Sequence, residues 1–445
     1  MRGLLLGLAL ALTACATAAP INGPLGGLQA DVRWRAPVGD DLIVLALSGG
    51  GARAASFHLG VLQALRDTPG GDGRPLTEHI ALITSVSGGS VLAAYYAQHG
   101  DAGLDTFGDA YLAQQWRVRR GRSPASWASM MRGGMNGPAQ LADWLDTHVY
   151  EGARMSALGA GPRVIINATD LYNSTPFAFT PFFFDGVCAN LTDVRVADAV
   201  AASMAAPVMF RPVLVESYAP RCDGPPAWTS RVLADRAEFE NVRQAARAFQ
   251  NYRGDTRAGQ HYVHLTDGGV ADNFGLLTLQ LMRAADGPPA PLTHAEAVQA
   301  RRVLLLVVNA EYVRPRTFQR EGTDAIGAYE MMYAPLDVAT EVSKRAMIDV
   351  WRADLQAFER ELRDYRCRLP ADVRRANWRC EDISVAMDVL TFRDMEAVEY
   401  DALFDTATDV SLPPETVAAL VAAGRGVARR NTALAEFAAA AVPGR

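Results

Sequence analysis

The chain has 445 residues, of which 49% are hydrophobic and 21% are charged, and its formal net charge is −6. This is the composition of a globular protein that is long enough to bury a large core. No run of lysine or arginine residues forms a basic patch, so the sequence argues against nucleic acid as a partner.

The first segment of the chain has the pattern of an export signal. Arg2 is followed by an apolar run from Leu4 to Ala14, which is too short for a membrane-spanning helix of about 20 residues. The run ends in "LTAC", which resembles the lipobox of bacterial lipoproteins. The resemblance implies that residues 1–14 are removed as a signal peptide and that Cys15 is then lipidated.

A lipidated Cys15 predicts a protein that is anchored to a membrane surface, because several acyl chains on one residue give stable anchoring. Ala16 follows the cysteine where an aspartate would favour the inner membrane. The same resemblance therefore favours the outer membrane, with the folded part in the periplasm or at the cell surface. The alternative is an ordinary signal peptide that is cleaved near Ala18 or Ala19. Residues 15–37 are rich in Ala, Gly and Pro and are typical of a flexible tether.

After the tether, apolar runs alternate with glycine turns and helical patterns. Residues 42–47 and 81–86 are mostly apolar runs of strand length, as in strands buried on both faces of a sheet. A glycine turn follows each run, and apolar residues at helical spacing follow the turn. Residues 163–170 and 303–310 are two further candidate strands. Strands that alternate with helices predict an α/β sandwich with a largely parallel sheet, within residues 38–310.

The first glycine turn, "SGGGARA", is a candidate anion-binding loop. Gly49, Gly50 and Gly51 lie between a strand and a helix, where backbone N–H groups can turn inward without interference from side chains. The pattern lacks the lysine of a phosphate loop and does not fit a dinucleotide-binding motif. An oxyanion hole fits better, with Arg53 either steadying the loop or facing a substrate phosphate. Seen alone, such a turn is more often structural.

The second glycine turn contains a candidate nucleophile, Ser87. The sequence from Ser85 to Gly89, "SVSGG", matches G-x-S-x-G with serine in the first position. A nucleophile elbow needs small residues around its serine because the bend is tight and strained. The helix that follows would direct its positive end toward the reacting centre. The alternative is a serine- and glycine-rich turn that caps a helix.

Residues 116–151 differ from the pattern on either side, because they are rich in Trp, Met, Gly and Arg. Two interpretations remain open. The segment is either a cap-like insertion over an apolar site or a surface subdomain that packs its own aromatic side chains.

A nucleophilic serine needs a base, and the sequence has two candidates. Asp267 follows the short apolar run "YVHL" and precedes a glycine pair, at a turn that can bring its carboxylate to the same sheet edge as Ser87. The alternative for this position is a simple Asp-Gly turn. His294 follows in the order Ser, Asp, His, but it lies in "PLTHAEAV", which is typical of an exposed helix start.

The last part of the chain is mainly helical in pattern. Residues 323–365 show helical spacing, and "SLPPETVAALVAAGRGVARR" begins with Ser411 as the expected cap and Glu415 in the first turn. The apolar run at residues 383–392 predicts one strand that returns to the sheet. We expect residues 311–445 to wrap around the core as a largely helical region.

The cysteines that follow Cys15 are even in number, and in an oxidising compartment they can form two disulfides. Of the three pairings that four cysteines allow, we favour the one that is local in sequence, Cys188 with Cys222 and Cys367 with Cys380. The alternative is free buried thiols. The spacing of the Cys and His residues predicts no metal site.

The three loops "SGGGARA", "SVSGG" and "TDGG", in this order, together resemble the patatin-like phospholipase family. Residues 196–213, "VADAVAASMAAPVMFRPV", and the sequence "NATDL" resemble two further stretches of that family. The resemblance covers residues 41–310. It implies a three-layer α/β/α sandwich with a mostly parallel central sheet.

The resemblance also assigns roles to single residues. It makes Ser87 the nucleophile and Asp267 its base, and it assigns the oxyanion hole to Gly49, Gly50, Gly51 and Arg53. Two loops depart from the family pattern. The glycine loop begins with Ser48 rather than aspartate and ends in Arg53-Ala54 rather than Arg-Gly. The elbow begins with Ser85 rather than glycine. All of these changes keep small residues.

The implied activity is that of a lipid acyl hydrolase, a serine esterase of the phospholipase A or lysophospholipase type. It would cleave carboxylic esters of lipids through a Ser87–Asp267 dyad and an acyl-enzyme, without cofactor or metal. A partly desolvated Asp267 would be a stronger base. The alternatives are a carboxylesterase that acts on soluble short-chain esters through His294 or another histidine, and a non-catalytic lipid-binding envelope lipoprotein. The sequence contains no indication of the oligomeric state.

Overall fold

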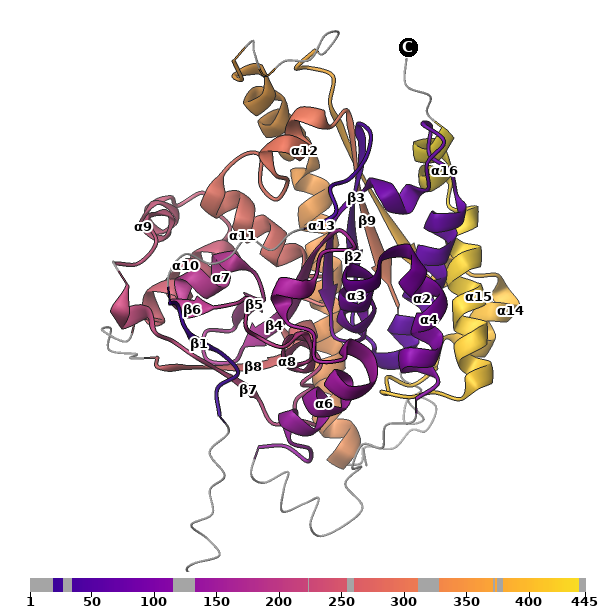
Figure 1. The fold of residues 1–445 in the computed structure, drawn as a ribbon, viewed down its shortest axis with the longest axis horizontal. Helices are drawn as coiled ribbons and strands as arrows, with labels where there is room; N and C mark the ends of the chain where they lie inside the picture. The colour runs from indigo at the N-terminus through magenta and orange to yellow at the C-terminus, as the bar shows by residue number, and fades with distance from the viewer. Residues whose placement is uncertain are drawn as a thin grey trace, which may run out of the picture.

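The computed structural model describes residues 19–26, 34–114, 133–222, 224–253, 260–310, 328–370, 373 and 379–439. Several expectations therefore lie outside the described residues, namely the signal peptide, the lipidation site at Cys15, and parts of the tether, of the 116–151 segment and of the C-terminal region. The described elements form a central sheet between layers of helices (Figure 1).

The central sheet has eight strands in the order β10-β9-β2-β3-β4-β8-β7, with β5 paired to β4. The five strands from β10 to β4 run parallel to their neighbours, and β5, β7 and β8 are antiparallel. The parallel strands are β2 (Asp41–Leu47), β3 (Ile80–Val86), β4 (Arg163–Asp170), β9 (Arg302–Asn309) and β10 (Ser384–Thr391). The antiparallel strands are β5 (Thr175–Ala178), β7 (Val213–Glu216) and β8 (Tyr262–Asp267).

The apolar runs of the sequence form the middle of this sheet. Every residue of β2 and of β3 is buried, because helices cover both faces of a parallel sheet and leave neither face to water. A small second sheet pairs β1 (Gly23–Pro24) with β6 (Ala189–Asn190).

Helices follow most of the strands, as the alternating pattern predicts. In the amino-terminal half they are α2 (Gly51–Asp67), α3 (Gly88–His99), α4 (Gly103–Phe107), α6 (Pro138–Leu145), α7 (Pro181–Gly186) and α8 (Val196–Ser203). In the carboxyl-terminal half they are α9 (Ala227–Ala234), α10 (Glu240–Asn251), α11 (Leu276–Asp286), α12 (His294–Gln299), α13 (Ala328–Cys367), α14 (Ala397–Leu403), α15 (Pro414–Arg430) and α16 (Thr432–Ala439).

The C-terminal region is continuous with the core. β10 pairs along its whole length with β9, which confirms the strand expected within residues 383–392. Figure 1 shows α13 passing beside the sheet and α15 lying along α2. The expected helix cap was wrong, because α15 begins at Pro414 with Pro413 at its N-cap, and Ser411 lies before it. Proline suits the first turn of a helix, where its missing N–H has no intrahelical acceptor.

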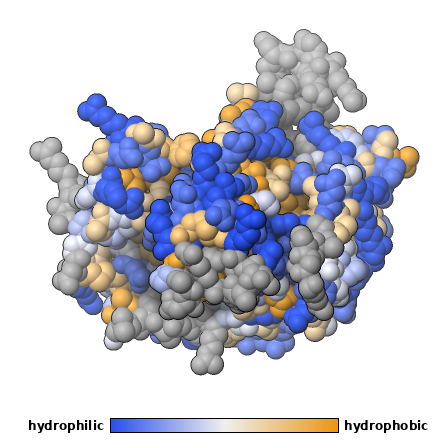
Figure 2. All heavy atoms as spheres, turned by 90° about the horizontal axis from the view of Figure 1, so that it is seen from above, coloured by the Kyte–Doolittle hydropathy of each residue, from blue (hydrophilic) through white to orange (hydrophobic). Residues whose placement is uncertain are grey.

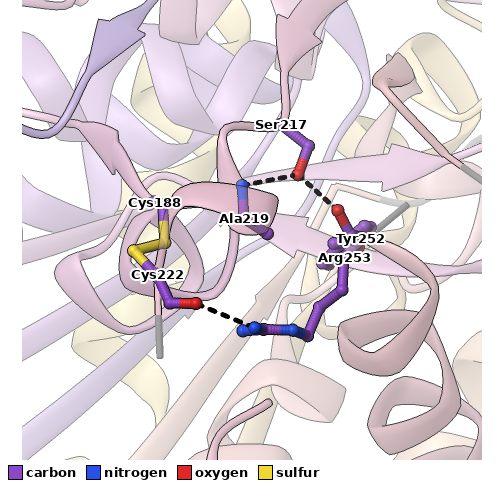
Figure 3. The surroundings of a disulfide bond; sticks show 6 residues. All are labelled: Cys188, Ser217, Ala219, Cys222, Tyr252 and Arg253. Carbon is purple, nitrogen blue, oxygen red and sulfur yellow. Dashed lines mark hydrogen bonds between the residues drawn. A yellow bond between two sulfur atoms is a disulfide. The ribbon is translucent and has the colours of Figure 1, made fainter. Parts of the chain in front are cut away.

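Two disulfide bonds each link two cysteines that are near each other in the sequence. Cys188, which follows α7, is bonded to Cys222, and Cys367 at the end of α13 is bonded to Cys380. Figure 3 shows the polar contacts beside the first bond. Arg253 donates to the carbonyl of Cys222 at 2.8 Å, and the hydroxyl of Ser217 donates to the carbonyl of Tyr252 at 2.6 Å.

The described part of the 116–151 segment packs against the core. α6 lies against α8, with Leu141 and Leu145 of α6 buried. Among the described residues, no helix is both long enough and apolar enough to span a bilayer. In the view of Figure 2, hydrophilic residues cover most of the described surface, and hydrophobic residues lie between them in small patches.

Candidate active site

Ser87 stands at the sharp bend between β3 and α3. Its backbone angles are φ 50° and ψ −122°, a region that residues with a side chain rarely adopt. Such strain persists only where the surroundings enforce it, and it clusters at functional sites. The backbone N–H of Ser87 donates to the hydroxyl of Ser203 on α8 at 2.8 Å, and only 8% of Ser87 is exposed.

The glycines after Ser87 are required by close packing against the first glycine loop. A Cβ on Gly88 would lie 2.1 Å from the carbonyl oxygen of Gly51. A Cβ on Gly89 would lie 2.7 Å from the carbonyl oxygens of Leu47 and Ser48. The elbow and the glycine loop therefore touch through their backbones, and a side chain at either glycine would separate them.

Ser85, which departs from the family pattern, belongs to a buried group of hydroxyls beneath the elbow. Its Oγ donates to the carbonyl of Ile165 at 3.1 Å. The Oγ of Ser90 lies 3.1 Å from that of Ser85 and 3.0 Å from that of Ser203, which in turn donates to the carbonyl of Asn167 at 2.6 Å. Serine is accommodated here because its hydroxyl finds partners inside the sheet.

Asp267 ends β8 beside the elbow. β8 pairs with β4, the neighbour of β3, so that Asp267 lies opposite Ala168. Its carboxylate accepts a hydrogen bond at 2.8 Å from the backbone N–H of Gly269, and the side chain of Ser87 lies close enough to act on its pKa. Desolvation raises the pKa of Asp267 to about 6, although Ser87 and Gly269 both act to lower it. The structure thus brings near each other two residues that are 180 positions apart in the sequence.

The glycine loop presents two backbone donors rather than three. The N–H of Gly49 already donates to Asn273, to its carbonyl oxygen at 3.3 Å and to its Oδ1 at 3.2 Å. Gly50 and Gly51 have φ values of 142° and 61°, where glycine is favoured. Within the described chain, no acceptor is bonded to the N–H of Gly50 or of Gly51. The expectation of an oxyanion hole is thereby narrowed to these two donors.

Arg53 steadies the loop, and the alternative of facing a substrate phosphate is not supported. The residue is 2% exposed. Its guanidinium donates to the carbonyl of Thr406 and to the hydroxyl of Thr408, each at 2.8 Å, and to the carbonyl of Ala310 at 3.2 Å. These three bonds direct the guanidinium into the protein, where it holds the loop to later parts of the chain.

His294 does not reach Ser87. It is the first residue of α12 and pairs with the hydroxyl of Tyr365 at 2.6 Å. α12 leads into the start of β9, whereas Ser87 follows the end of the parallel strand β3. The two residues thus lie at opposite ends of the parallel strands, which are separated by roughly 20 Å along the strand direction. None of the histidines, all of which are described, hydrogen-bonds Ser87 or Asp267.

Sequence reasoning missed two residues of this site, Asn273 and Ser203. Asn273 lies in "TDGGVADNFG" and joins the Asp267 loop to the glycine loop. Ser203 lies in the "AASMAAP" stretch and holds the elbow. A polar residue within each of these motifs was the available signal. Among the described residues, one group of side chains lies close enough to share a metal ion, and it contains the disulfide-bonded Cys367 and Cys380 with Glu381.

Comparisons with known proteins give one family match and several similar solved structures. The family model described as patatin-like phospholipase matches residues 45–279. Among solved structures, VipD from Legionella pneumophila is 12% identical, with a TM-score of 0.34, over 91% of this chain and 70% of that one. Human GIVD cytosolic phospholipase A2 is 14% identical, with a TM-score of 0.26, over 61% of this chain and 45% of that one. No curated protein matches the chain.

The family match extends from the middle of β2 to α11 and includes the glycine loop, the elbow and Asp267. On that match the chain belongs to the patatin-like phospholipase family, which indicates a lipid ester hydrolase.

Proposed function

We propose that the protein hydrolyses carboxylic esters of lipids as a phospholipase A or lysophospholipase, with Ser87 as nucleophile and Asp267 as base. One observation carries the proposal. Ser87 is held at φ 50° on a strand-to-helix bend, with its side chain close enough to the carboxylate of Asp267 to act on the pKa of that carboxylate. A strained serine beside a base is the arrangement that nucleophilic catalysis requires.

In the acylation step, Ser87 Oγ attacks the ester carbonyl and its proton passes to Asp267. The carbonyl oxygen becomes an oxyanion, which the N–H groups of Gly50 and Gly51 are placed to bind. One such donor contributes roughly 3 kcal/mol to the stability of the transition state. The C–O bond then breaks, and Asp267 returns the proton to the departing alcohol. The acyl group remains on Ser87.

In the deacylation step, water takes the place of the alcohol. Asp267 accepts a proton from the water as the water oxygen attacks the acyl carbonyl. Collapse of the second tetrahedral intermediate breaks the bond to Ser87, and the proton returns to Ser87 Oγ. The raised pKa of Asp267, at about 6, makes this carboxylate a better base than an ordinary aspartate and leaves it ionised at neutral pH.

The test compares Ser87→Ala and Asp267→Asn with wild type on a panel of phospholipids, lysophospholipids and short-chain esters. Each substitution should lower kcat/KM by about 100-fold or more, since it removes the nucleophile or the base. Ser156→Ala and Asp401→Asn, at exposed positions, are the matched controls and should leave kcat/KM unchanged.

Three outcomes would contradict the proposal. Full activity in both active-site variants would exclude the dyad. Hydrolysis of short-chain esters alone would point to the soluble carboxylesterase. An intact protein whose Ser87 never reacts with a fluorophosphonate probe would point to a non-catalytic lipid-binding lipoprotein.

We further propose that the protein is an exported lipoprotein, anchored through Cys15 in the outer membrane. The support is the lipobox-like "LTAC" sequence with Ala16 after the cysteine. Cells grown with a labelled fatty acid should incorporate it into the wild-type protein and not into Cys15→Ala. Equal labelling of both proteins, or none of the wild type, would refute the anchor.

A further inference from the structure

The segment at residues 406–409, between α14 and α15, contacts the glycine loop from outside the matched family region. The carbonyl of Asp409 accepts the backbone N–H of Ala52 at 2.7 Å. A Cβ on Gly51 would lie 2.2 Å from that same oxygen. The 406–409 segment therefore lies directly on the first turn of α2.

Arg53 forms the second connection between the two segments. Its guanidinium donates to Thr406 and to Thr408, which are more than 350 residues later in the chain. The same guanidinium lies against the loop, because a Cβ on Gly50 would be 2.7 Å from its Nη2. One buried cation thus holds the 406–409 segment on one side and contacts the backbone of Gly50 on the other.

We infer that the 406–409 segment is a positioning element for the oxyanion loop. The inference rests on the proposed function, in which Gly50 and Gly51 bind the oxyanion. Consecutive glycines with positive φ allow a loop many conformations, whereas donors to an oxyanion must be preorganised. Asp409 occupies the N–H of Ala52, and Thr408 fixes Arg53 beside Gly50. Among the three loop glycines, Gly50 and Gly51 have N–H groups with no acceptor in the described chain.

α15 anchors the segment to the core. It packs on α2 at two glycines, where a Cβ on Gly60 would lie 2.0 Å from the carbonyl oxygen of Val421 and a Cβ on Gly424 would lie 2.1 Å from that of Phe57. Backbone contact at both positions fixes α15 relative to α2, and the 406–409 segment immediately precedes α15. The C-terminal region in this way fixes the segment that contacts the glycine loop.

Thr408 is the position at which to test the inference, because it is exposed and donates nothing to the core. Thr408→Val keeps the shape of the side chain and removes the acceptor for Arg53. We expect kcat on a lipid ester to fall about 10-fold with KM changed less than about twofold, because the loss affects the transition state. Thr408→Ser restores the acceptor and should keep kcat within about twofold of wild type.

The matched control is Thr147→Val, an exposed threonine whose hydroxyl donates to the carbonyl of Asp143. It should leave kcat and KM unchanged. A Thr408→Val variant with wild-type kcat would overturn the inference, and so would an equal loss in Thr408→Ser, since that loss would not depend on the hydroxyl.

A second measurement does not depend on activity. Amide hydrogen exchange in peptides covering residues 48–57 should be faster in Thr408→Val than in wild type, and the same difference should appear in the Ser87→Ala background. Unchanged exchange would overturn the positioning role even if the proposed hydrolase activity is established. Conversely, if Ser87→Ala shows that the hydrolase proposal fails, the exchange result still tests whether the 406–409 segment restrains the loop.

Discussion

Asp267 is a half-buried residue at the centre of the site, and its ionisation links catalysis to pH. The carboxylate accepts a hydrogen bond from Gly269, and the side chain of Ser87 also acts to lower its pKa. Desolvation outweighs both effects and raises the pKa to about 6. Two measurable consequences follow, one kinetic and one thermodynamic.

The kinetic prediction concerns the pH profile of kcat/KM. Asp267 acts as a base only when ionised, so activity should be low at pH 5, rise through pH of about 6 and level off above pH 7. The measurement is kcat/KM on one ester between pH 4.5 and 8 in buffers of constant ionic strength. Asp401→Asn is the control and should show the same profile. A profile that rises near pH 4 would show that the carboxylate is not desolvated in this way.

The thermodynamic prediction concerns Asp267→Asn. The pKa of Asp267 is higher in the folded protein than its ordinary value of 3.8, so the folded state binds the proton more tightly than the unfolded state does. The wild-type free energy of unfolding therefore decreases as the pH rises through the window from 4 to 6. Asparagine cannot ionise, so the stability of the variant relative to wild type should increase by on the order of 2 kcal/mol between pH 4 and pH 8.

Urea unfolding of both proteins at pH 4 and pH 8 measures this difference. Exposed Asp401→Asn should show no comparable change with pH. A constant difference between Asp267→Asn and wild type would mean that Asp267 has the same pKa in the folded and unfolded states.

At the scale of elements, the pairing of α2 with α15 depends on glycine for close approach. Gly60 lies in the interior of α2 and Gly424 in the interior of α15, where glycine is unfavourable for a helix by roughly 1 kcal/mol. Each faces a backbone carbonyl of the opposite helix at a distance that leaves no room for a Cβ. The contact between the helices thus explains two residues that helix propensity alone disfavours.

Two glycines of α15 provide a matched comparison. Gly424→Ala should destabilise the protein by about 2 kcal/mol, because a rigid backbone carbonyl lies 2.1 Å from the new Cβ. Gly426→Ala meets only the flexible side chain of Arg430, at 3.0 Å, and should stabilise the protein by roughly 0.5 kcal/mol through helix propensity. Thermal or urea unfolding measures both. If both variants changed the free energy of unfolding in the same direction, close packing against α2 would not be the reason for glycine at position 424.

At the scale of the whole molecule, the chain after the family match completes the fold. β10 extends the central sheet, α13 passes beside that sheet, and α15 covers α2 (Figure 1). The Cys367–Cys380 disulfide closes the connection between α13 and β10, and the Cys188–Cys222 disulfide closes a separate segment beside α7. Both restrict the conformations of the unfolded chain.

Removal of each disulfide should lower the free energy of unfolding. The loops span 34 residues for Cys188–Cys222 and 13 residues for Cys367–Cys380. Chain entropy then gives a loss of about 3 to 4 kcal/mol for the longer loop and about 3 kcal/mol for the shorter one. Urea unfolding of the two Cys→Ala double variants measures this. Reductant should destabilise wild type and leave a variant without the four cysteines unchanged, and a wild type indifferent to reductant would contradict the prediction.

Sequence patterns among neighbouring residues were enough to predict the parallel strands and the loops that follow them. Periodicity and turn chemistry are properties of neighbouring residues, so the apolar runs identified β2, β3, β4 and β9, and the glycine turns identified the loops that follow β2 and β3. They missed the start of α15, because Ser411 and the prolines are both typical helix-start residues and only Pro413 occupies the N-cap.

By itself the sequence predicted the strands β2, β3, β4, β9 and β10, the three glycine-flanked loops and the candidate residues Ser87 and Asp267. The tertiary structure alone decided how these loops are held. Gly49 donates to Asn273, 224 residues away, and Arg53 donates to Thr408, 355 residues away. Hydrogen-bond partners at such separations leave no local pattern in the chain. For that reason the sequence could suggest an oxyanion loop, and only the fold could show that Gly50 and Gly51 keep N–H groups without an acceptor in the described chain while Arg53 steadies the loop.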